Sequence, residues 1–357
     1  MRKTLFKWHS WFALVAMVPL FVISITGSLL VFKVEIDHLL MPEKSTVQVE
    51  PSAQRLPIDE LIQSAQNVHP DFAIGSWELF DNQHRADAIY VIKHGTDQWH
   101  KMYINQYTGE VLAAPVDVSH YFTDWLLDLH YRFLLGTTGA IVGAVISILF
   151  LFLGISGVVL YRNFWKNFFT LRWGKAKRIL YSDIHKFTGI ISSPIILILA
   201  FTGGYWNIAE SIHEVTEHAF EEHYLIEAPL HNTDLSLQGM LDDQTQHLSD
   251  FKATYMVLPY EPGLNITFYG QVDSANPLHS EYASTLTYDP QNGKLLHVGD
   301  VRSNPALHVI VDSFRKLHFG YFGGLTSKII WCVIGLSPLI LGFTGLYLYL
   351  VRSRRIG

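Results

Sequence analysis

The chain has 357 residues, of which 49% are hydrophobic, with a mean hydropathy of +0.19 and a formal net charge of −6. The apolar residues cluster in stretches that reach the roughly 20 residues a helix needs to cross a bilayer, so the distribution predicts a membrane protein with large polar segments. The single cysteine, Cys332, excludes intrachain disulfides, C-x-x-C-H haem attachment and all-cysteine clusters.

The first apolar stretch runs from about residue 10 to residue 33, directly after Met1, Arg2 and Lys3. Its apolar run is too long for a signal peptide and no A-x-A-like site follows it, so we expect a retained membrane helix. Three further stretches of sufficient length lie near 137–161, 187–209 and 325–350. Four membrane-spanning helices are therefore predicted.

The polar segment between the first two spans is predicted to form one helix and a small sheet. Residues 56–68 place Ile58, Leu61 and Ala65 at helical spacing, just after Pro57. Alternating and β-branched stretches then predict strands within 72–80, 86–95, 98–107 and 110–114. Between the third and fourth spans the order repeats, with a helix near 235–248 and strands within 251–258, 264–270, 280–289 and 294–298.

Basic residues mark one side of the predicted membrane. The link between the second and third spans carries Arg162, Lys166 and Arg172, followed by three more basic residues, and the chain ends with Arg352, Arg354 and Arg355. By the positive-inside rule, both termini and this link are expected in the cytoplasm, and the two polar segments outside it.

The chain reads as two copies of one unit. Aligned without a gap, residues 129–161 and 317–349 both open with Leu-His and end with Leu-Tyr, and Gly154 and Gly157 match Gly342 and Gly345. Each copy contains a span, an outer lobe and a second span. The fold class expected is a membrane all-α four-helix bundle of two repeated hairpins, with a pseudo-two-fold axis along the membrane normal and two small α+β extracytoplasmic lobes.

This organisation predicts the following segments: a first membrane helix at 1–40, a first lobe at 41–120, an interfacial segment and second helix at 121–162, a cytoplasmic link at 163–183, a third helix at 184–213, a second lobe at 214–308, and an interfacial segment, fourth helix and tail at 309–357.

Four histidines near the span ends are the candidate site residues. The repeat pairs His9 with His185 near the cytoplasmic face, and His130 with His318 near the outer face. Ionisable residues in a membrane usually mark a function, although for any one of these histidines taken alone an interfacial ring bound to water is the simpler explanation. Residues related by a two-fold axis face each other across a bundle, which is the arrangement that two imidazoles need to bind one haem iron.

The flanking glycines favour a flat haem over a bare metal ion, for which two histidines alone form a poor site. Gly27 and Gly203 lie on the histidine-bearing faces of their helices, five turns beyond His9 and His185. Small residues at close helix crossings are the simpler explanation for the glycines themselves.

Other histidines leave alternatives open. His38 and His213 form a second repeat-related pair and are rivals for the outer iron. His130 and His318 precede glycine-containing segments and are therefore candidates for short interfacial helices rather than the spans themselves. Glu217 and His218, one turn from His213, could form a metal site, although a solvated acidic helix face is the simpler reading.

Several motifs resemble the PepSY-associated transmembrane family, whose members include inner-membrane reductases of ferric siderophores in Gram-negative bacteria. They are the opening W-H-S-W, Thr26-Gly27, Thr202-Gly203, the two Leu-His pairs and the segment M-Y-I-N-Q-Y-T-G-E-V-L at 102–112. The resemblance covers essentially the full length, and the second lobe departs from it with T-Y-D-P-Q-N-G-K-L-L.

We therefore expect a protein with two haem b groups, bound by His9 with His185 and by His130 with His318, that reduces a ferric siderophore or another ferric chelate on the periplasmic side of the inner membrane. No flavin or nicotinamide domain is encoded, so a cytoplasmic flavin reductase or quinol must supply electrons. The bilayer is an expected partner and nucleic acid is not. The alternatives are a PepSY-type binding or regulatory protein without redox activity, and electron flow in the opposite direction.

Overall fold

The computed structural model describes residues 1–163, 170–220 and 224–353. The chain divides into two compact units. The helical unit comprises Met1–Lys33, Trp125–Glu221 and Arg315–Gly357, and the lobe unit comprises Val34–Asp124 and Glu222–Phe314.

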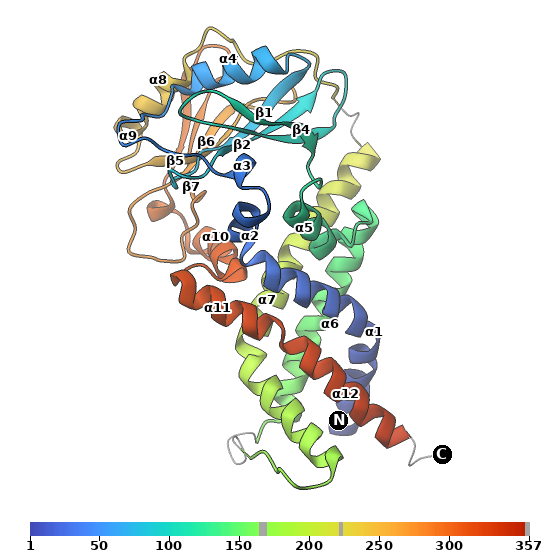
Figure 1. The fold of residues 1–357 in the computed structure, drawn as a ribbon. Helices are drawn as coiled ribbons and strands as arrows, with labels where there is room; N and C mark the ends of the chain where they lie inside the picture. Colours follow the sequence, from blue (N-terminus) through green and yellow to red (C-terminus); the bar gives the residue numbers. More distant parts are fainter. Residues whose placement is uncertain (164–169, 221–223, 354–357) are drawn as a thin grey trace. The chain divides into compact units, whose positions relative to one another are not determined.

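The helical unit contains four helical segments that are long and apolar enough to cross a membrane. They are α1 (Arg2–Leu30), α6 (Gly136–Leu160), α7 (Lys177–Phe220), and the combined segment of α11 (Gly324–Gly335) and α12 (Ser337–Ser353). Both α1 and α7 pack against α6 and against α12 (Figure 1).

The fourth span is broken in the middle into two helices, and this break was not predicted from the sequence. Helix α11 ends at Gly335 and α12 begins at Ser337. Pro338 follows immediately, and because proline has no N–H to donate and its ring clashes with the preceding turn, it commonly interrupts or kinks a helix.

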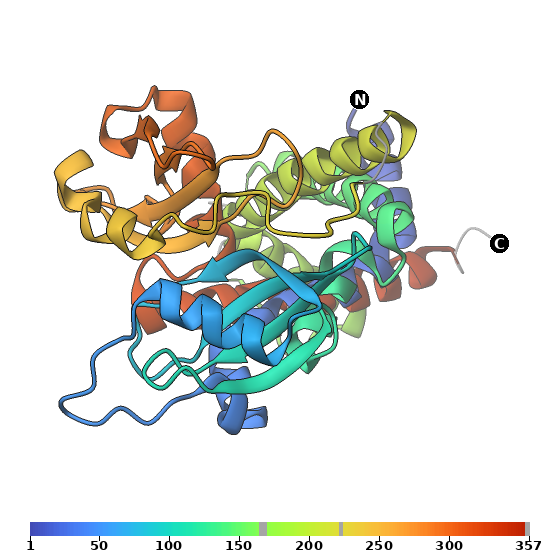
Figure 2. The ribbon, with the colours of Figure 1, turned by 90° about the horizontal axis from the view of Figure 1, so that it is seen from above.

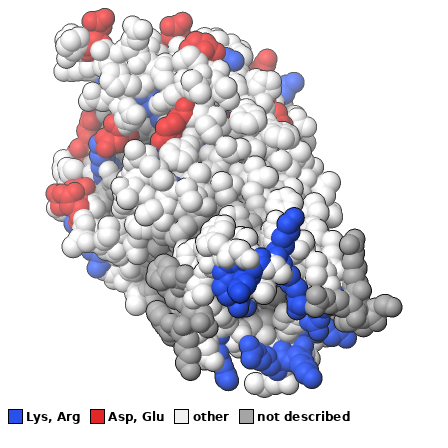
Figure 3. All heavy atoms as spheres, turned by 60° about the horizontal axis from the view of Figure 1, so that its bottom comes forward, with Lys and Arg blue, Asp and Glu red and all other residues white. Residues whose placement is uncertain are grey.

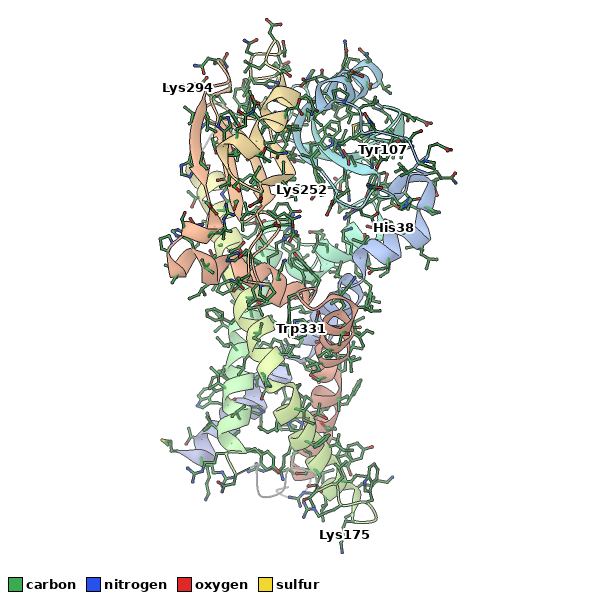
Figure 4. The ribbon with its side chains drawn as sticks, turned by 90° about the vertical axis from the view of Figure 1, so that its left-hand side faces the viewer. His38, Tyr107, Lys175, Lys252, Lys294 and Trp331 are labelled. Atoms are coloured by element: carbon green, nitrogen blue, oxygen red, sulfur yellow. The ribbon has the colours of Figure 1, made fainter. Side chains whose placement is uncertain are left out.

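One end of the helical unit gathers the basic residues. The Arg2 guanidinium donates to the carbonyl of Leu160 at 3.2 Å, and the Arg352 guanidinium lies 4.9 Å from the centre of the Phe6 ring, so α1, α6 and α12 have ends close together. Figure 3 shows Lys and Arg clustered over this end. Lys175, in the link before α7, is labelled there in Figure 4. This common basic end is the pattern that the positive-inside rule uses for orientation.

The lobe unit contains one eight-stranded antiparallel sheet in the order β4-β3-β2-β1-β5-β6-β7-β8. The first four strands are β1 (Phe72–Glu78), β2 (Asp87–Lys93), β3 (Trp99–Ile104) and β4 (Val111–Asp117), and the last four are β5 (Lys252–Val257), β6 (Ile266–Gln271), β7 (Ser284–Tyr288) and β8 (Leu295–Gly299). All of the strand segments expected from the sequence are present.

The two small lobes expected from the sequence share one large sheet, because their two sets of four strands are joined. Strand β1 pairs with β5 over Ser76 to Glu78, with Trp77 opposite Met256. An unpaired edge strand exposes a row of backbone donors and acceptors. Joining the two sets at β1 and β5 satisfies two such edges at once.

Helices cover one face of this sheet. Helix α4 (Ile58–Val68) lies over the first four strands, and α8 (Leu237–Asp242) and α9 (Gln244–His247) occupy the place of the single expected helix over the others (Figures 1 and 2). The fully buried side chains of Trp77, Met256 and Phe268 form part of one core beneath them.

Helices α4 and α8 cap each other. The Asp59 carboxylate accepts hydrogen bonds from the backbone N–H groups of Leu237 and Gln238 at 2.9 and 3.3 Å. The Gln238 side-chain oxygen accepts one from the N–H of Ile58 at 2.9 Å. Because Asp59 and Gln238 are each the second residue of their helix, the capping is reciprocal, and it ties the two halves of the lobe unit together.

Short helices connect the spans to the sheet. They are α2 (Lys33–Leu40), α3 (Pro42–Ser45), α5 (Phe122–Arg132), the 3-10 turn η2 (Val301–Ser303) and α10 (Ala306–Phe319). Helices α5 and α10 each begin in the lobe unit and end in the helical unit.

Candidate haem sites

The structure places the four candidate histidines on four different helices. His9 lies on α1 and His185 on α7, whereas His130 lies on α5 and His318 on α10. The outer candidates are thus on short helices that precede the spans, which was the alternative left open by the sequence. All four side chains are half-buried.

His130 and His318 face each other. Their ring centres are 6.3 Å apart and the ring planes differ by 67°. Metal bonds to imidazole nitrogen are about 2 Å long, so two nitrogens that share one ion lie about 4 Å apart. Since each ring centre lies behind its nitrogen, a separation of 6.3 Å between centres is compatible with one metal ion held between the two rings.

Each outer imidazole is bonded to a threonine of a neighbouring span. The Nδ1 atom of His130 lies 2.9 Å from the Thr26 hydroxyl oxygen, and that of His318 lies 2.8 Å from the Thr202 hydroxyl oxygen. Both hydroxyls donate their own hydrogen to the carbonyl four residues earlier in their helix, Thr26 to Val22 and Thr202 to Ile198, at 2.7 Å each.

These bonds fix the tautomer of the outer histidines. A hydroxyl that already donates to a carbonyl can only accept from the imidazole, so the hydrogen of each ring must be on Nδ1. Nε2 then carries the lone pair that a metal ligand requires.

The inner candidates have the same type of hydroxyl partner. Here α1 and α7, which carry the threonines of the outer pair, carry the histidines. His185 Nδ1 lies 2.9 Å from the Thr344 hydroxyl on α12, which donates to the carbonyl of Ile340 at 2.6 Å. His9 Nδ1 lies 2.7 Å from the Ser156 hydroxyl on α6, whose bond to its own helix, to the carbonyl of Leu153, is longer at 3.3 Å.

A glycine follows each of these hydroxyl residues and makes room for the ring. A Cβ atom added to Gly27 would lie 2.7 Å from His130 Cε1, and one added to Gly203 would lie 3.1 Å from His318 Cε1. The corresponding distances are 3.4 Å from Gly345 to His185 and 3.7 Å from Gly157 to His9. Every candidate histidine therefore rests on a Ser/Thr-Gly pair of a neighbouring span.

The other two glycines of the repeat have a different role. Cβ atoms at Gly154 and Gly342 would meet Leu197 and Phe21, respectively. These two glycines therefore serve helix packing, the simpler explanation that the sequence had left open.

The ends of α5 and α10 are fixed beside the outer histidines. The Asn207 side-chain amide of α7 donates to the carbonyl of Tyr131 at 3.3 Å, and a Cβ at Gly139 would lie 1.5 Å from the carbonyl oxygen of Arg132. On the other side, Trp331 of α11, labelled in Figure 4, donates its indole N–H to the carbonyl of Leu317 at 2.6 Å. Each histidine is thus next to a backbone carbonyl held by a different span.

The rival histidines lie in different units of the chain. His38 lies on α2 in the lobe unit (Figure 4), and its buried Nε2 has no hydrogen-bond partner among the described residues. His213 lies on α7 in the helical unit. The side chains of Glu217 and His218, proposed with His213 as a metal site, lie outside the described residues. Within the part of the chain that the structure describes, no group of three or more His, Cys, Asp or Glu residues could hold a metal ion.

The hydroxyl partners of the histidines were not predicted from the sequence. A usable signal was present, because a Ser/Thr-Gly pair occurs in every span: at 26–27, 156–157, 202–203 and 344–345. Thr26-Gly27 and Thr202-Gly203 were noticed only as markers of the span ends.

The outer pair fits a bis-histidine haem site, because two neighbouring imidazoles each have a hydroxyl at Nδ1 and a glycine beside the ring. His9 and His185 each have a hydroxyl and a glycine in the same places. Along the continuous helix α1, His9 and Thr26 are separated by about 25 Å, so the two sites lie at different depths of the helical unit.

A comparison with characterised proteins finds no match. The family described as the PepSY-associated TM region matches residues 6–352, which is nearly the whole chain. With its four candidate membrane-spanning helices and its duplicated sheet, this chain therefore belongs to the PepSY-associated transmembrane family.

Proposed function

We propose that this protein is a di-haem, b-type electron-transfer protein of the bacterial inner membrane that reduces a ferric siderophore or another ferric chelate on the periplasmic side. The observation that carries the proposal is the outer pair, in which two facing imidazoles 6.3 Å apart each have Nδ1 bonded to a threonine hydroxyl. A histidine that only hydrogen-bonds to interfacial water needs neither a facing partner nor a fixed tautomer.

The residues have separate tasks in this proposal. His130 and His318 would hold the outer haem, and His9 and His185 the inner one. Bound haem would supply a one-electron Fe(III)/Fe(II) couple at each depth. The four hydroxyls orient the imidazoles and keep Nε2 unprotonated. Gly27, Gly203 and Gly345 keep the space beside three of the rings open.

The basic end of the helical unit supports the proposed orientation. Its arginines and lysines would face the cytoplasm, which places His9 and His185 on the cytoplasmic side and His130 and His318 on the periplasmic side. Electrons would come from a cytoplasmic flavin reductase or from quinol. One electron reduces the chelated Fe(III) to Fe(II), which hard oxygen ligands hold less tightly, and iron is released.

A visible spectrum of the full-length protein purified in detergent tests the proposal. We expect a Soret band, and split α and β bands after reduction, at two haems per chain. Absence of these bands after expression with excess haem would refute the electron-transfer function and leave the non-redox PepSY binding protein as the explanation. Re-oxidation of the reduced protein by a panel of ferric chelates then identifies the class of acceptor.

A further inference from the structure

A carboxylate stands at the same place in both helices that carry the outer histidines. The segments D-W-L-L-D-L-H at 124–130 and D-S-F-R-K-L-H at 312–318 each place an aspartate six positions before the histidine. Six residues correspond to about 9 Å along a helix and to about two thirds of a turn beyond one full turn, so aspartate and histidine point to different sides of α5 and α10.

In α5, the carboxylate of Asp124 accepts a charge-assisted hydrogen bond from the lobe. The Lys101 ammonium of β3 donates to it at 2.9 Å, and the side chains of Lys101 and Asp124 are only 5% and 8% exposed. The adjacent Thr123 hydroxyl donates to Asp37 of α2. The first turn of α5 is therefore bonded to two other elements of the lobe unit.

In α10, the equivalent Asp312 is also bonded to the lobe, but by different chemistry. Both the backbone N–H and the hydroxyl of Ser280, which lies just before β7, donate to this carboxylate, the N–H at 2.9 Å. The two halves of the repeat thus keep the aspartate and differ in its donors, a buried ammonium in one and a serine in the other.

We propose that Asp124 and Asp312 are positioning residues that connect the lobe unit to the outer haem ligands. Each carboxylate holds the lobe-side end of a helix whose other end presents His130 or His318 to its threonine. His9 and His185, in contrast, belong to the long helices α1 and α7. The expected effect on the outer haem rests on the proposed function. The anchoring of α5 and α10 by the two carboxylates does not depend on it.

The experiment uses the full-length protein in detergent with the variants Asp124→Ala, Asp312→Ala, Asp312→Asn and Ser280→Ala. Hydrogen exchange is followed in α5 and α10 by mass spectrometry, and the midpoint potentials of both haems by spectroelectrochemistry. The control is Asp59→Ala, which removes three hydrogen bonds within the lobe unit but none to α5 or α10.

We expect Asp312→Ala to increase amide exchange in α10 about tenfold, as loss of charge-assisted hydrogen bonds implies, and to leave α5 unchanged. Asp124→Ala should have the converse effect. Both should shift the potential of the outer haem and not of the inner one. Asp312→Asn, which retains an acceptor oxygen, should restore most of the wild-type behaviour, and Ser280→Ala should fall in between.

The proposal is overturned if Asp59→Ala produces the same exchange or the same potential shift as the two anchor variants, or if these variants leave α5 and α10 unchanged. A wild-type protein without haem would refute the proposed function, whereas hydrogen exchange would still decide whether the two carboxylates anchor the helices.

Discussion

In both the inner and the outer histidine pair, a Ser/Thr-Gly pair on a neighbouring helix positions each imidazole. The helices that carry the imidazoles in one pair carry the hydroxyls in the other. Helices α1 and α7 supply the imidazoles of the inner pair and the hydroxyls and glycines of the outer pair. The inner imidazoles therefore come from long helices packed on both sides, and the outer imidazoles from short helices that must be fixed at each end. The comparison teaches that the same Ser/Thr-Gly pair can position an imidazole that comes from a long helix or from a short one.

Removing one histidine from each pair should have the largest effect. We expect His9→Ala and His318→Ala each to lose one of the two haems, because one imidazole is a weak site. A pyridine haemochrome assay per chain measures this loss. His297→Ala, at an exposed position on β8, serves as the control. Unchanged haem content in both variants would show that the assignment of ligands is wrong.

The glycines offer a graded comparison of the two pairs. Gly27→Ala should displace His130 and abolish the outer haem, since the added Cβ would lie 2.7 Å from the ring, whereas Gly157→Ala, at 3.7 Å from His9, should retain both haems. Haem content and the low-spin electron paramagnetic resonance signals of both variants check this. Equal losses in both variants would mean that the glycines serve helix packing alone.

Loss of a hydroxyl should weaken one site and spare the other. Thr202→Val should reduce the retention of the outer haem by about 10-fold to 100-fold, as is usual for removal of a hydrogen bond to a metal-binding histidine. Thr344→Val should do the same for the inner haem. Competition with apomyoglobin measures retention. Thr202→Ser keeps the acceptor, so a loss in Thr202→Ser as large as that in Thr202→Val would contradict the tautomer argument.

The smallest expected effect is on the stability of the lobe unit and should leave both histidine pairs intact. A hydrogen bond from Arg302 lowers the pKa of Asp300. A lowered carboxylate pKa stabilises the fold above the unfolded value of about 3.9 and loses this contribution as the pH falls through the folded value. Asp300→Asn should therefore decrease the free energy of unfolding by about 0.2 to 1 kcal/mol at pH 7.

As the pH falls through the lowered pKa of Asp300, the difference between Asp300→Asn and the wild type should disappear, because Asp300 is then protonated in both the folded and the unfolded chain. Thermal unfolding followed by circular dichroism in a pH series from neutral to acidic provides the measurement. If the difference in stability between Asp300→Asn and the wild type stayed constant across the pH range, the loss of the charge would not be its cause.

Much of the fold was predictable because its signals are local. Four apolar stretches and a series of alternating segments gave every span and every strand of the sheet. The pairing of β1 with β5 was not predictable, because it joins segments far apart in the chain and depends on which edges remain open. The break before Pro338 was visible in the sequence but was outweighed by the length of the apolar run.

The candidate site was predicted at the level of its imidazoles and not of their support. Internal symmetry paired His130 with His318, and the structure brings these two rings together. The bond from Thr26 to His130 depends on the rotation of α1 relative to α5, which no spacing within either segment determines. Residue type alone therefore did not distinguish a packing threonine from one that fixes a tautomer.

The junction between β1 and β5 has a consequence for the origin of the molecule. A half-length ancestor with a single lobe could have completed its sheet by pairing β1 with the same strand of a second copy, in an isologous homodimer. Fusion of two such genes would make the two copies free to diverge. The serine at 156, where the second copy has Thr344, is a difference that a symmetric dimer could not have carried.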